Sequence, residues 1–243
     1  MTQKHIPDFA KDQDFHTFLR DYLQAYPDDA LTIREEVSAD QDPTSIVWEL
    51  ARQGKHPLLV FDKVRDQGAK LVTNMFASRE RVARMLGVEV QHLHEEYQAR
   101  ARRLVAPNVV KSGPVLDSVE HGNFDLHTLP IVKHFATDKG PYITNAVIVA
   151  EHPDTGVGNM SYHRSMLHSS TEIATSLHSR GHLWRLLQIA AERKQPLPVA
   201  MVIGAHPLFM LAGAARLPFG VDERHVAGGL FGAPLDVVRT PKY

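Results

Sequence analysis

The sequence lacks cysteine, an excess of either charge and any long apolar run. The absence of cysteine from all 243 residues excludes a disulfide framework, a thiolate nucleophile and a thiolate metal site. A net charge of −1 without a basic stripe does not fit a nucleic-acid-binding protein. No apolar run approaches the roughly 18 residues of a membrane span, and the polar N-terminus lacks the apolar segment of a signal peptide. We therefore expect a cytoplasmic protein that binds neither nucleic acid nor membrane.

The first 107 residues carry alternating helix and strand patterns, which predict an N-terminal α/β domain over 1–107. Apolar residues recur with the period of an amphipathic helix from Phe15 to Leu23, and again after Asp42-Pro43, where we expect Asp42 to be the N-cap. Ser78 is the expected N-cap of a further helix. Strands are predicted over 31–35, 57–61 and 69–76, and a polar helix over 90–103.

The rest of the sequence divides into a linker and a second domain over 142–243. Gly, Pro, Asp and His scattered through 108–141 predict a linker and an irregular entry segment. Two β-rich runs then flank Pro153-Asp154-Thr155-Gly156, which is a good signal of a hairpin. The elements expected next are a helix over 182–193, a buried strand over 198–204, a helix of small residues from His206-Pro207, a helix from Val221 to Gly228-Gly229, and a strand within 234–240.

Four short stretches of the second domain stand out: TNAV (144–147), GNMSYHR (158–164), GH (181–182) and LPFGVDE (217–223). In order, spacing and residue type they resemble the UbiD family, the decarboxylases that use prenylated FMN. A single N-x-S-x-x-R motif would carry no weight, whereas four matches in order are specific. The resemblance implies an α+β chain in which the N-terminal α/β domain precedes a flavin-binding split β-barrel domain with helices. That barrel domain is partial here, and the C-terminal domain of the family is absent.

The resemblance implies a divalent metal site at Asn159, His182 and Glu223, because these positions match the family's asparagine, histidine and glutamate ligands. In the family the metal bridges to the cofactor phosphate. An amide oxygen, an imidazole nitrogen and a carboxylate suit Mn2+ or Mg2+ and leave positions open for phosphate and water. Each residue also has an ordinary structural interpretation: Asn159 as a turn residue of the hairpin, His182 as an exposed helix start, and Glu223 as an acid that favours a helix N-terminus.

Arg164 matches the active-site arginine of the family, which holds the substrate carboxylate, and a guanidinium suits that planar group. Its ordinary interpretation is a surface salt bridge. The resemblance implies the following cofactor-binding residues: Thr144, Asn159, Met160, Ser161, Tyr162, Arg164, His182 and Glu223. Thr144 and Ser161 could equally be plain strand hydroxyls. On a regular strand Asn159 and Ser161 would share one face and Arg164 would point away, so we predict an irregularity of the strand between 161 and 164.

Two features depart from the family pattern. Gly181 stands where some members carry glutamine. Gly213-Ala214-Ala215-Arg216 stands where some members carry hydroxyl residues near a K+ ion, so K+ is implied less firmly than the divalent metal. Family members also continue beyond the matched region with two catalytic glutamates and a domain that closes the site. We therefore expect a fragment, one piece of a split protein or a degenerate relative, and a chain that is inactive alone.

The function implied by the resemblance is reversible, non-oxidative decarboxylation of an α,β-unsaturated or (hetero)aromatic carboxylic acid on prenylated FMN. The partners implied are the small-molecule acid, a flavin prenyltransferase that supplies the cofactor, the missing half or a companion chain, and further copies of the complete protein in a homo-oligomer. The alternative is a non-catalytic UbiD-like subunit that binds cofactor or regulates a complete enzyme. A simple FMN-binding split-barrel oxidoreductase would not explain the Asn/His/Glu set.

Overall fold

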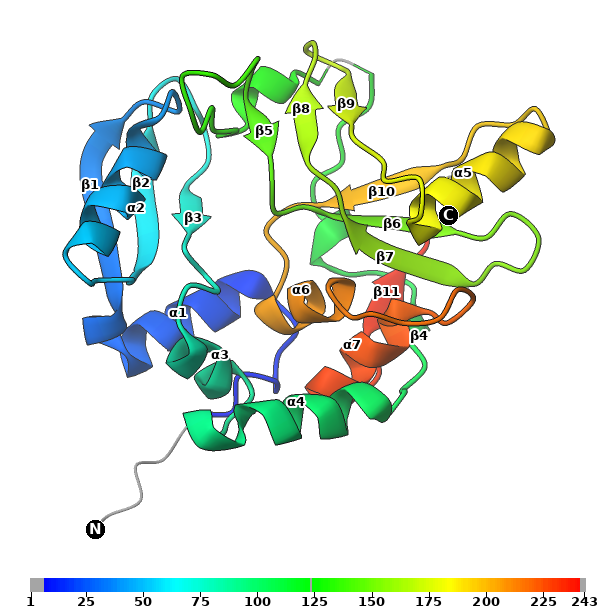
Figure 1. Ribbon diagram of the computed structural model, residues 1–243, viewed down its shortest axis with the longest axis horizontal. Helices are drawn as coiled ribbons and strands as arrows, with labels where there is room; N and C mark the ends of the chain where they lie inside the picture. The colour runs from blue at the N-terminus through cyan, green and yellow to red at the C-terminus, as the bar shows by residue number, and fades with distance from the viewer. Residues whose placement is uncertain (1–6, 123, 241–243) are drawn as a thin grey trace.

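The computed structural model describes residues 7–122 and 124–240, so the outermost ends of the two predicted domains lie outside the described residues. Its first region contains one small sheet and four α-helices (Figure 1). Strand β1 pairs parallel with β2, which pairs antiparallel with β3. The elements are α1 (Phe15–Ala25), η1 (Pro27–Asp29), β1 (Ala30–Val37), α2 (Asp42–Arg52), β2 (Leu58–Val64), β3 (Leu71–Thr73), α3 (Arg79–Met85), η2 (Val90–His92) and α4 (Leu93–Arg102).

The periodic and capping signals of this region are confirmed at α1 and α3. Helix α1 buries Phe18 and Tyr22 from the predicted apolar face. Ser78 accepts a hydrogen bond from the backbone N–H of Arg81, as an N-cap does. The predicted cap of α2 is wrong by one residue. The N-cap is Gln41, because the Asp42 carboxylate instead accepts a hydrogen bond from the backbone N–H of Ser38 at 2.8 Å.

Strand β3 is shorter than the strand predicted over 69–76. Its pairing ends at Thr73, and Asn74 has a positive φ of 67°. The Asn74 side chain donates a hydrogen bond to the carbonyl of Pro57 at 2.9 Å. An asparagine tolerates the left-handed region better than most residues, so this position turns the chain out of the sheet.

The second region contains two antiparallel sheets and one parallel pair (Figure 1). The sheets have the orders β10-β6-β7 and β5-β8-β9, and β11 pairs with β4. The elements are β4 (Asn108–Val110), η3 (Pro114–Leu116), η4 (Leu126–Thr128), β5 (Tyr142–Ile143), β6 (Val147–Glu151), β7 (Gly158–Tyr162), β8 (Ser165–Leu167), β9 (Ile173–Thr175), α5 (His182–Glu192), β10 (Val199–Val202), α6 (Pro207–Gly213), α7 (Glu223–Phe231) and β11 (Asp236–Val238).

The predicted hairpin and the predicted strand irregularity are both confirmed. β6 and β7 pair from Val147 opposite Tyr162 to Glu151 opposite Gly158. β7 then ends at Tyr162, and Ser165 begins β8 in the other sheet. His163 and Arg164 therefore form the corner at which the chain leaves one sheet and enters the next.

Two predictions for the C-terminal elements are wrong. Helix α7 runs through Gly228-Gly229 to Phe231 and ends at Gly232, which has a φ of 73°. A Cβ at Gly228 would lie 2.6 Å from the carbonyl oxygen of Val105, so this glycine permits close packing rather than ending the helix. Strand β10 is not buried, because it lies at the edge of its sheet, and Val199 is 49% exposed.

One hydrophobic core joins the two regions. Its buried members include Phe18 and Leu58 from the first region and Val147, Leu208 and Leu230 from the second. The fold is the predicted mixed type, with helices around several small sheets, and the division at 107 and 141 stays a prediction. Within the described residues, no helix is both long enough and apolar enough to cross a membrane.

Candidate functional site

Asn159, His182 and Glu223 lie together, although they come from three separate elements. Asn159 is in β7, His182 is the first residue of α5, and Glu223 is the first residue of α7. The Asn159 amide nitrogen donates to the Glu223 carboxylate, with distances of 3.3 and 3.2 Å to its two oxygens. The His182 Nδ1 atom lies 4.0 Å from Glu223 Oε1. The expected convergence of these side chains is confirmed, and their role as metal ligands stays a prediction.

Glu223 is a buried carboxylate surrounded by neutral donors. Its side chain is 3% exposed, and the backbone N–H of Met160 donates to Oε2 at 2.9 Å. Among the described residues no lysine or arginine forms an ion pair with it. Burial raises the pKa of Glu223 and the charge of Asp222 adds to the rise, although the hydrogen bonds from Met160 and Asn159 act against it. The rise in pKa reflects a carboxylate that is buried without a lysine or arginine partner among the described residues.

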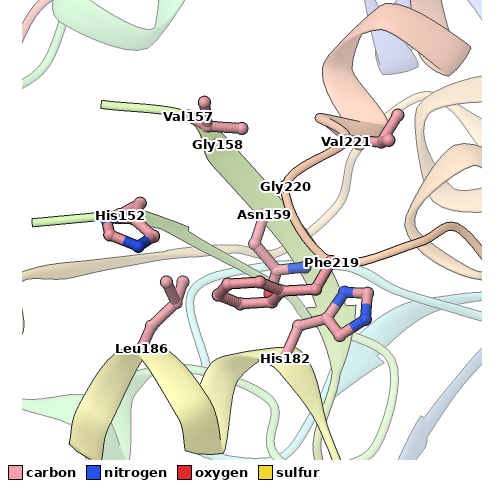
Figure 2. Close-up of a pocket in the computed structure, with 9 residues that line it drawn as sticks. All are labelled: His152, Val157, Gly158, Asn159, His182, Leu186, Phe219, Gly220 and Val221. Atoms are coloured by element: carbon pink, nitrogen blue, oxygen red, sulfur yellow. The ribbon is translucent and has the colours of Figure 1, made fainter. Parts of the chain in front are cut away.

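A small pocket adjoins these side chains, and Figure 2 shows the Asn159 and His182 side chains beside the ring of Phe219. The His182 and Phe219 rings meet edge to face, with 5.4 Å between their centroids. The Arg185 guanidinium lies 4.0 Å from the centroid of the Phe219 ring. The residues lining the pocket are His152, Val157, Gly158, Asn159, His182, Leu186, Phe219, Gly220 and Val221.

A wider pocket of about 460 Å³ shares His182 and Phe219 with the small pocket. Its remaining lining comes from the start of α5 and the turn before it: Ser179, Arg180, Gly181, Trp184, Arg185 and Gln188. Sequence reasoning missed Phe219 and Arg185. Phe219 lies inside the LPFGVDE stretch. An aromatic residue in a loop directly before a helix was the available signal that this side chain could line the site.

The other predicted cofactor-binding residues of β7 differ in whether they contact Asn159 and Glu223. The Ser161 hydroxyl donates to Asn159 Oδ1 at 3.4 Å and lies 3.0 Å from His163 Nε2, so Ser161 extends the polar cluster. Met160 is buried in the core, and only its backbone N–H faces Glu223. The Tyr162 hydroxyl donates to the carbonyl of Met210 at 2.7 Å, which directs it toward α6.

Thr144 and Arg164 are both exposed. Thr144 lies between β5 and β6, and Arg164 lies at the corner between β7 and β8. In the part of the chain that the structure describes, the Arg164 side chain forms no ion pair, so the alternative interpretation as a surface salt bridge is not supported there. An arginine without a carboxylate partner can receive an anion from solution.

The donor set of this site can be compared with the ligands that a divalent cation prefers. The described residues contain no cluster of three or more His, Cys, Asp or Glu side chains that could hold a metal ion. The candidate set instead combines an amide, an imidazole and a carboxylate, which suits Mn2+ or Mg2+. Asn159 at present turns its amide nitrogen toward Glu223, so a cation would require the amide to turn its oxygen inward. Because Glu223 is buried and has no lysine or arginine partner among the described residues, the set fits the ion.

Models of one carboxy-lyase family match most of the chain. The 3-octaprenyl-4-hydroxybenzoate carboxy-lyase N-terminal domain matches residues 24–101, and the Rift-related domain of the same carboxy-lyase matches residues 108–243. The chain belongs to the UbiD family.

Several curated relatives are named as decarboxylases. The chain is 33% identical to anhydromevalonate phosphate decarboxylase of Methanothermobacter thermautotrophicus, over 91% of this chain and 50% of the relative. It is 27% identical to phenolic acid decarboxylase of Sedimentibacter hydroxybenzoicus, over 93% of this chain and 50% of that protein. The chain thus spans about half the length of these relatives.

Solved structures of UbiD-class enzymes share the fold. An evolved dimeric form of HmfF from Pelotomaculum thermopropionicum, in complex with prFMN, superposes with a TM-score of 0.87 at 29% identity and covers 96% of this chain and 54% of its own. The closed form of vanillic acid decarboxylase (ShVdcCD) from Sedimentibacter hydroxybenzoicus gives a TM-score of 0.87 at 26% identity, over 96% of this chain and 51% of that one.

Proposed function

We propose that this chain forms the cation- and flavin-binding part of a UbiD-type decarboxylase that acts on an α,β-unsaturated or (hetero)aromatic carboxylic acid. The observation that carries the proposal is the buried Glu223 carboxylate, which lies beside Asn159 and His182 and has no lysine or arginine partner among the described residues. A buried charge of this kind is costly unless something neutralises it. A divalent cation does so, and the similarity to HmfF in complex with prFMN supports a flavin as its neighbour.

Each residue has a defined task in this proposal. Asn159, His182 and Glu223 hold Mn2+ or Mg2+, and the cation anchors the cofactor phosphate. Ser161 supports Asn159 through its hydroxyl. Thr144 contributes a second hydroxyl to the cofactor. Prenylated FMN, when bound, supplies the covalent chemistry that releases CO2. Gly213 to Arg216 carry no hydroxyl side chain, so K+ is left out of the proposal.

Arg164 is the proposed substrate-binding residue of this chain. Its exposure and its lack of an ion pair among the described residues leave the guanidinium available to a carboxylate. The corner after β7 supports this role, because it lets Arg164 leave the regular alternation that starts at Asn159. In that position Arg164 orients the carboxylate group that departs as CO2.

We further propose that the activity also uses residues that this chain does not supply. The resemblance assigns the proton donor to a glutamate beyond the matched region, and the chain spans about half of its relatives. We therefore propose that the chain works with a second polypeptide segment or a companion chain, in a homo-oligomer, and receives its cofactor from a flavin prenyltransferase. The names of the relatives suggest an anhydromevalonate phosphate-like or a phenolic acid as substrate.

Coexpression with a flavin prenyltransferase and the completing polypeptide, followed by an absorption spectrum and a decarboxylation screen, tests the proposal. Arg164→Ala should retain the flavin and lose at least about tenfold in kcat/KM, because one substrate ion pair is removed. Glu223→Ala should lose the flavin. Full activity in both variants contradicts the proposal. An active complex that ignores Arg164→Ala but requires Glu223 would instead identify a cofactor-binding or regulatory subunit.

A further inference from the structure

Arg224 forms an ion-pair cluster directly beside the candidate cation site. Its guanidinium contacts Asp222 at 2.7 Å through Nη2 and Glu151 at 2.8 Å through Nη1. Its Nε atom also donates to both oxygens of Asp222, at 3.0 and 2.8 Å. The Arg224 and Asp222 side chains are 17% and 8% exposed. Arg224 and Asp222 are therefore largely buried, the Glu151 side chain is 37% exposed, and one positive charge is shared between two carboxylates.

This cluster joins α7 to both sides of the β6–β7 hairpin. Glu151 is the last residue of β6, and Asp222 is the N-cap of α7. Asp222 Oδ2 also accepts a hydrogen bond from the backbone N–H of Gly158, the first residue of β7, at 3.1 Å. A Cβ at Gly158 would collide with the Arg224 guanidinium, so a larger residue there would force this side chain to move. One arginine thus fixes the helix start against both strands.

In the described part of the chain, the same arrangement leaves Glu223 without a lysine or arginine partner. Asp222 and Glu223 are adjacent acids, yet Arg224 pairs with Asp222 and not with Glu223. The hairpin that Arg224 holds also supplies the two groups that face Glu223, the side chain of Asn159 and the backbone N–H of Met160. A shift of the hairpin relative to α7 would separate these groups from the carboxylate.

We propose that Arg224 is a positioning residue that sets Glu223 against Asn159 and Met160 and thereby sets the affinity of the site for a divalent cation. This inference rests on the proposed cation-binding function. Residues that orient metal ligands typically contribute 10- to 100-fold to metal affinity. Arg224 acts in this way without touching the cation, because its own partners are Asp222 and Glu151.

A Mn2+ titration of the protein, with free Mn2+ measured by electron paramagnetic resonance, tests the inference. Arg224→Met should weaken Mn2+ binding roughly 10- to 100-fold. Arg224→Lys should fall between wild type and Arg224→Met, because a lysine keeps the charge but not the fork that reaches both acids. Equal Mn2+ affinity in wild type and Arg224→Met would overturn the inference.

Arg100 provides the matched control at the opposite end of α7. It is also partly buried, and it donates to the carbonyl of Leu230 in α7 at 3.1 Å and to that of Leu86 at 2.9 Å. Arg100→Met should lower the free energy of unfolding and leave the Mn2+ affinity within about twofold of wild type, since outlying substitutions act independently of the site. An equal loss of Mn2+ affinity in Arg100→Met would mean that any destabilisation of α7 suffices, which contradicts a specific role of Arg224.

A double-mutant cycle tests whether Gly158 acts on Mn2+ binding through the position of the Arg224 guanidinium. Gly158→Ala should displace the guanidinium and weaken Mn2+ binding, as is expected of Arg224→Met. The double variant should be no weaker than the poorer single variant, because both changes break one arrangement. Additive losses would show that Gly158 acts independently of Arg224 and would overturn the spatial argument.

Hydrogen exchange at the Met160 amide tests the positioning without any metal. Arg224→Met should lower the protection of this amide, which donates to Glu223, while the Leu230 amide keeps its protection. Unchanged protection of Met160 overturns the inference by itself. Failure of the wild-type protein to bind Mn2+ would instead contradict the proposed cation site, and the amide measurement would still decide the role of Arg224.

Discussion

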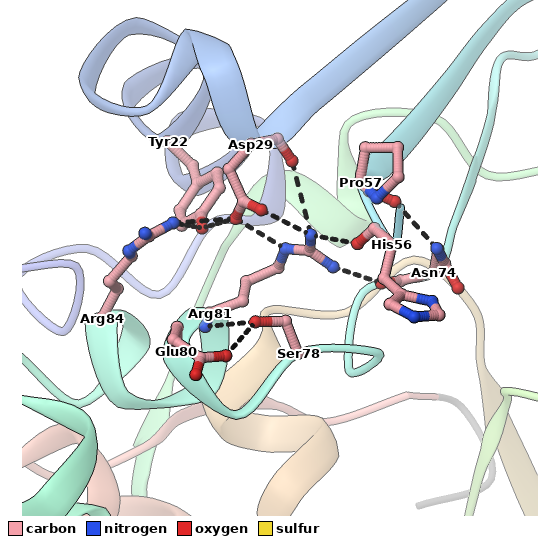
Figure 3. A network of polar contacts seen from close by, with 9 residues as sticks. All are labelled: Tyr22, Asp29, His56, Pro57, Asn74, Ser78, Glu80, Arg81 and Arg84. Carbon is pink, nitrogen blue, oxygen red and sulfur yellow. Dashed lines mark hydrogen bonds and ion pairs between the residues drawn. The ribbon is translucent and has the colours of Figure 1, made fainter. Parts of the chain in front are cut away.

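Two buried charged groups, Arg81 in the first region and Glu223 in the second, differ in how completely their neighbours satisfy them. Arg81 is 0% exposed and binds Asp29 at 3.0 Å through Nε and at 2.9 Å through Nη2. Its terminal nitrogens also donate to the carbonyls of Asn74 and His56, each at 2.6 Å (Figure 3). Every nitrogen of this guanidinium therefore has an acceptor.

The pKa values of the two carboxylates, Asp29 and Glu223, are shifted in opposite directions. Burial alone would raise the pKa of Asp29, but hydrogen bonds from Arg81 and Tyr22 and the charges of Arg81 and Arg84 lower it below its ordinary value. Burial raises the pKa of Glu223, and the charge of the nearby Asp222 adds to the rise. Only neutral hydrogen-bond donors act against it. A completed ion-pair network stabilises structure, whereas a buried carboxylate without a cation keeps the capacity to bind one.

Replacing Arg81 should have the largest effect on stability. Arg81→Met leaves the Asp29 carboxylate partly buried with Arg84 as its remaining cation, and breaking a buried ion pair costs about 3–5 kcal/mol. Urea unfolding measures this loss, and Arg79→Met at an exposed position of the same helix should stay within about 0.5 kcal/mol of wild type. A loss below about 1 kcal/mol in Arg81→Met would remove the contrast between the two regions.

His206 is a third buried group, and it should give a pH dependence of similar size. Burial lowers the pKa of His206 to about 4, although its hydrogen bond with the Phe9 carbonyl opposes this. The folded protein then binds the proton less well than the unfolded chain. The contribution of the neutral His206 ring to the free energy of unfolding is on the order of 3 kcal/mol. It should be fully present above about pH 6.5 and lost as the pH falls toward 4.

Urea unfolding as a function of pH measures this effect in wild type and in His206→Gln, which cannot gain a proton in that range. The variant should lose less stability than wild type between pH 6.5 and 4. Parallel pH profiles would show that His206 takes up its proton without unfolding and would contradict the buried, neutral ring.

The N-cap of α3, Ser78, should contribute less to the free energy of unfolding than Arg81 does. Ser78 accepts the backbone N–H of Arg81 at 3.2 Å, so Ser78→Ala should cost about 1 kcal/mol and leave the guanidinium network intact. A double-mutant cycle with Arg81→Met measures the coupling of the two residues. Coupling larger than the effect of Ser78→Ala alone would show that the cap is part of the network.

Glu223→Gln should have the smallest effect on the free energy of unfolding. It therefore gives the clearest contrast with Arg81→Met. The amide removes a buried charge and can keep the hydrogen bond from Met160, so the unfolding free energy should rise by no more than about 1 kcal/mol. A decrease above about 2 kcal/mol in urea unfolding would make Glu223 a structural residue like Arg81.

Features that depend on local sequence could be predicted. The apolar period identified α1, the Pro-Asp-Thr-Gly joint identified the β6–β7 hairpin, and the alternation of side chains required the corner at 163–164. The convergence of Asn159, His182 and Glu223 came from the family resemblance rather than from any local pattern. Local signals carry this information because they act between residues a few positions apart.

Features that depend on distant contacts could not be predicted. Gly228-Gly229 resembled a helix stop, but their role is close packing against backbone near Val105, which is far away in the sequence. The apolar composition of β10 indicated burial, while its edge position decides its exposure. Arg224 was missed because its partner Glu151 is 73 residues away.

Diffraction from crystals of the protein grown with Mn2+, at a wavelength that gives an anomalous signal from manganese, tests the central claim most directly. The account predicts one strong anomalous peak bounded by the Asn159 amide, the His182 imidazole and the Glu223 carboxylate, and no such peak in Glu223→Gln. A peak elsewhere, or a Glu223 side chain that stays bound only to Asn159 and Met160 at saturating Mn2+, would contradict it.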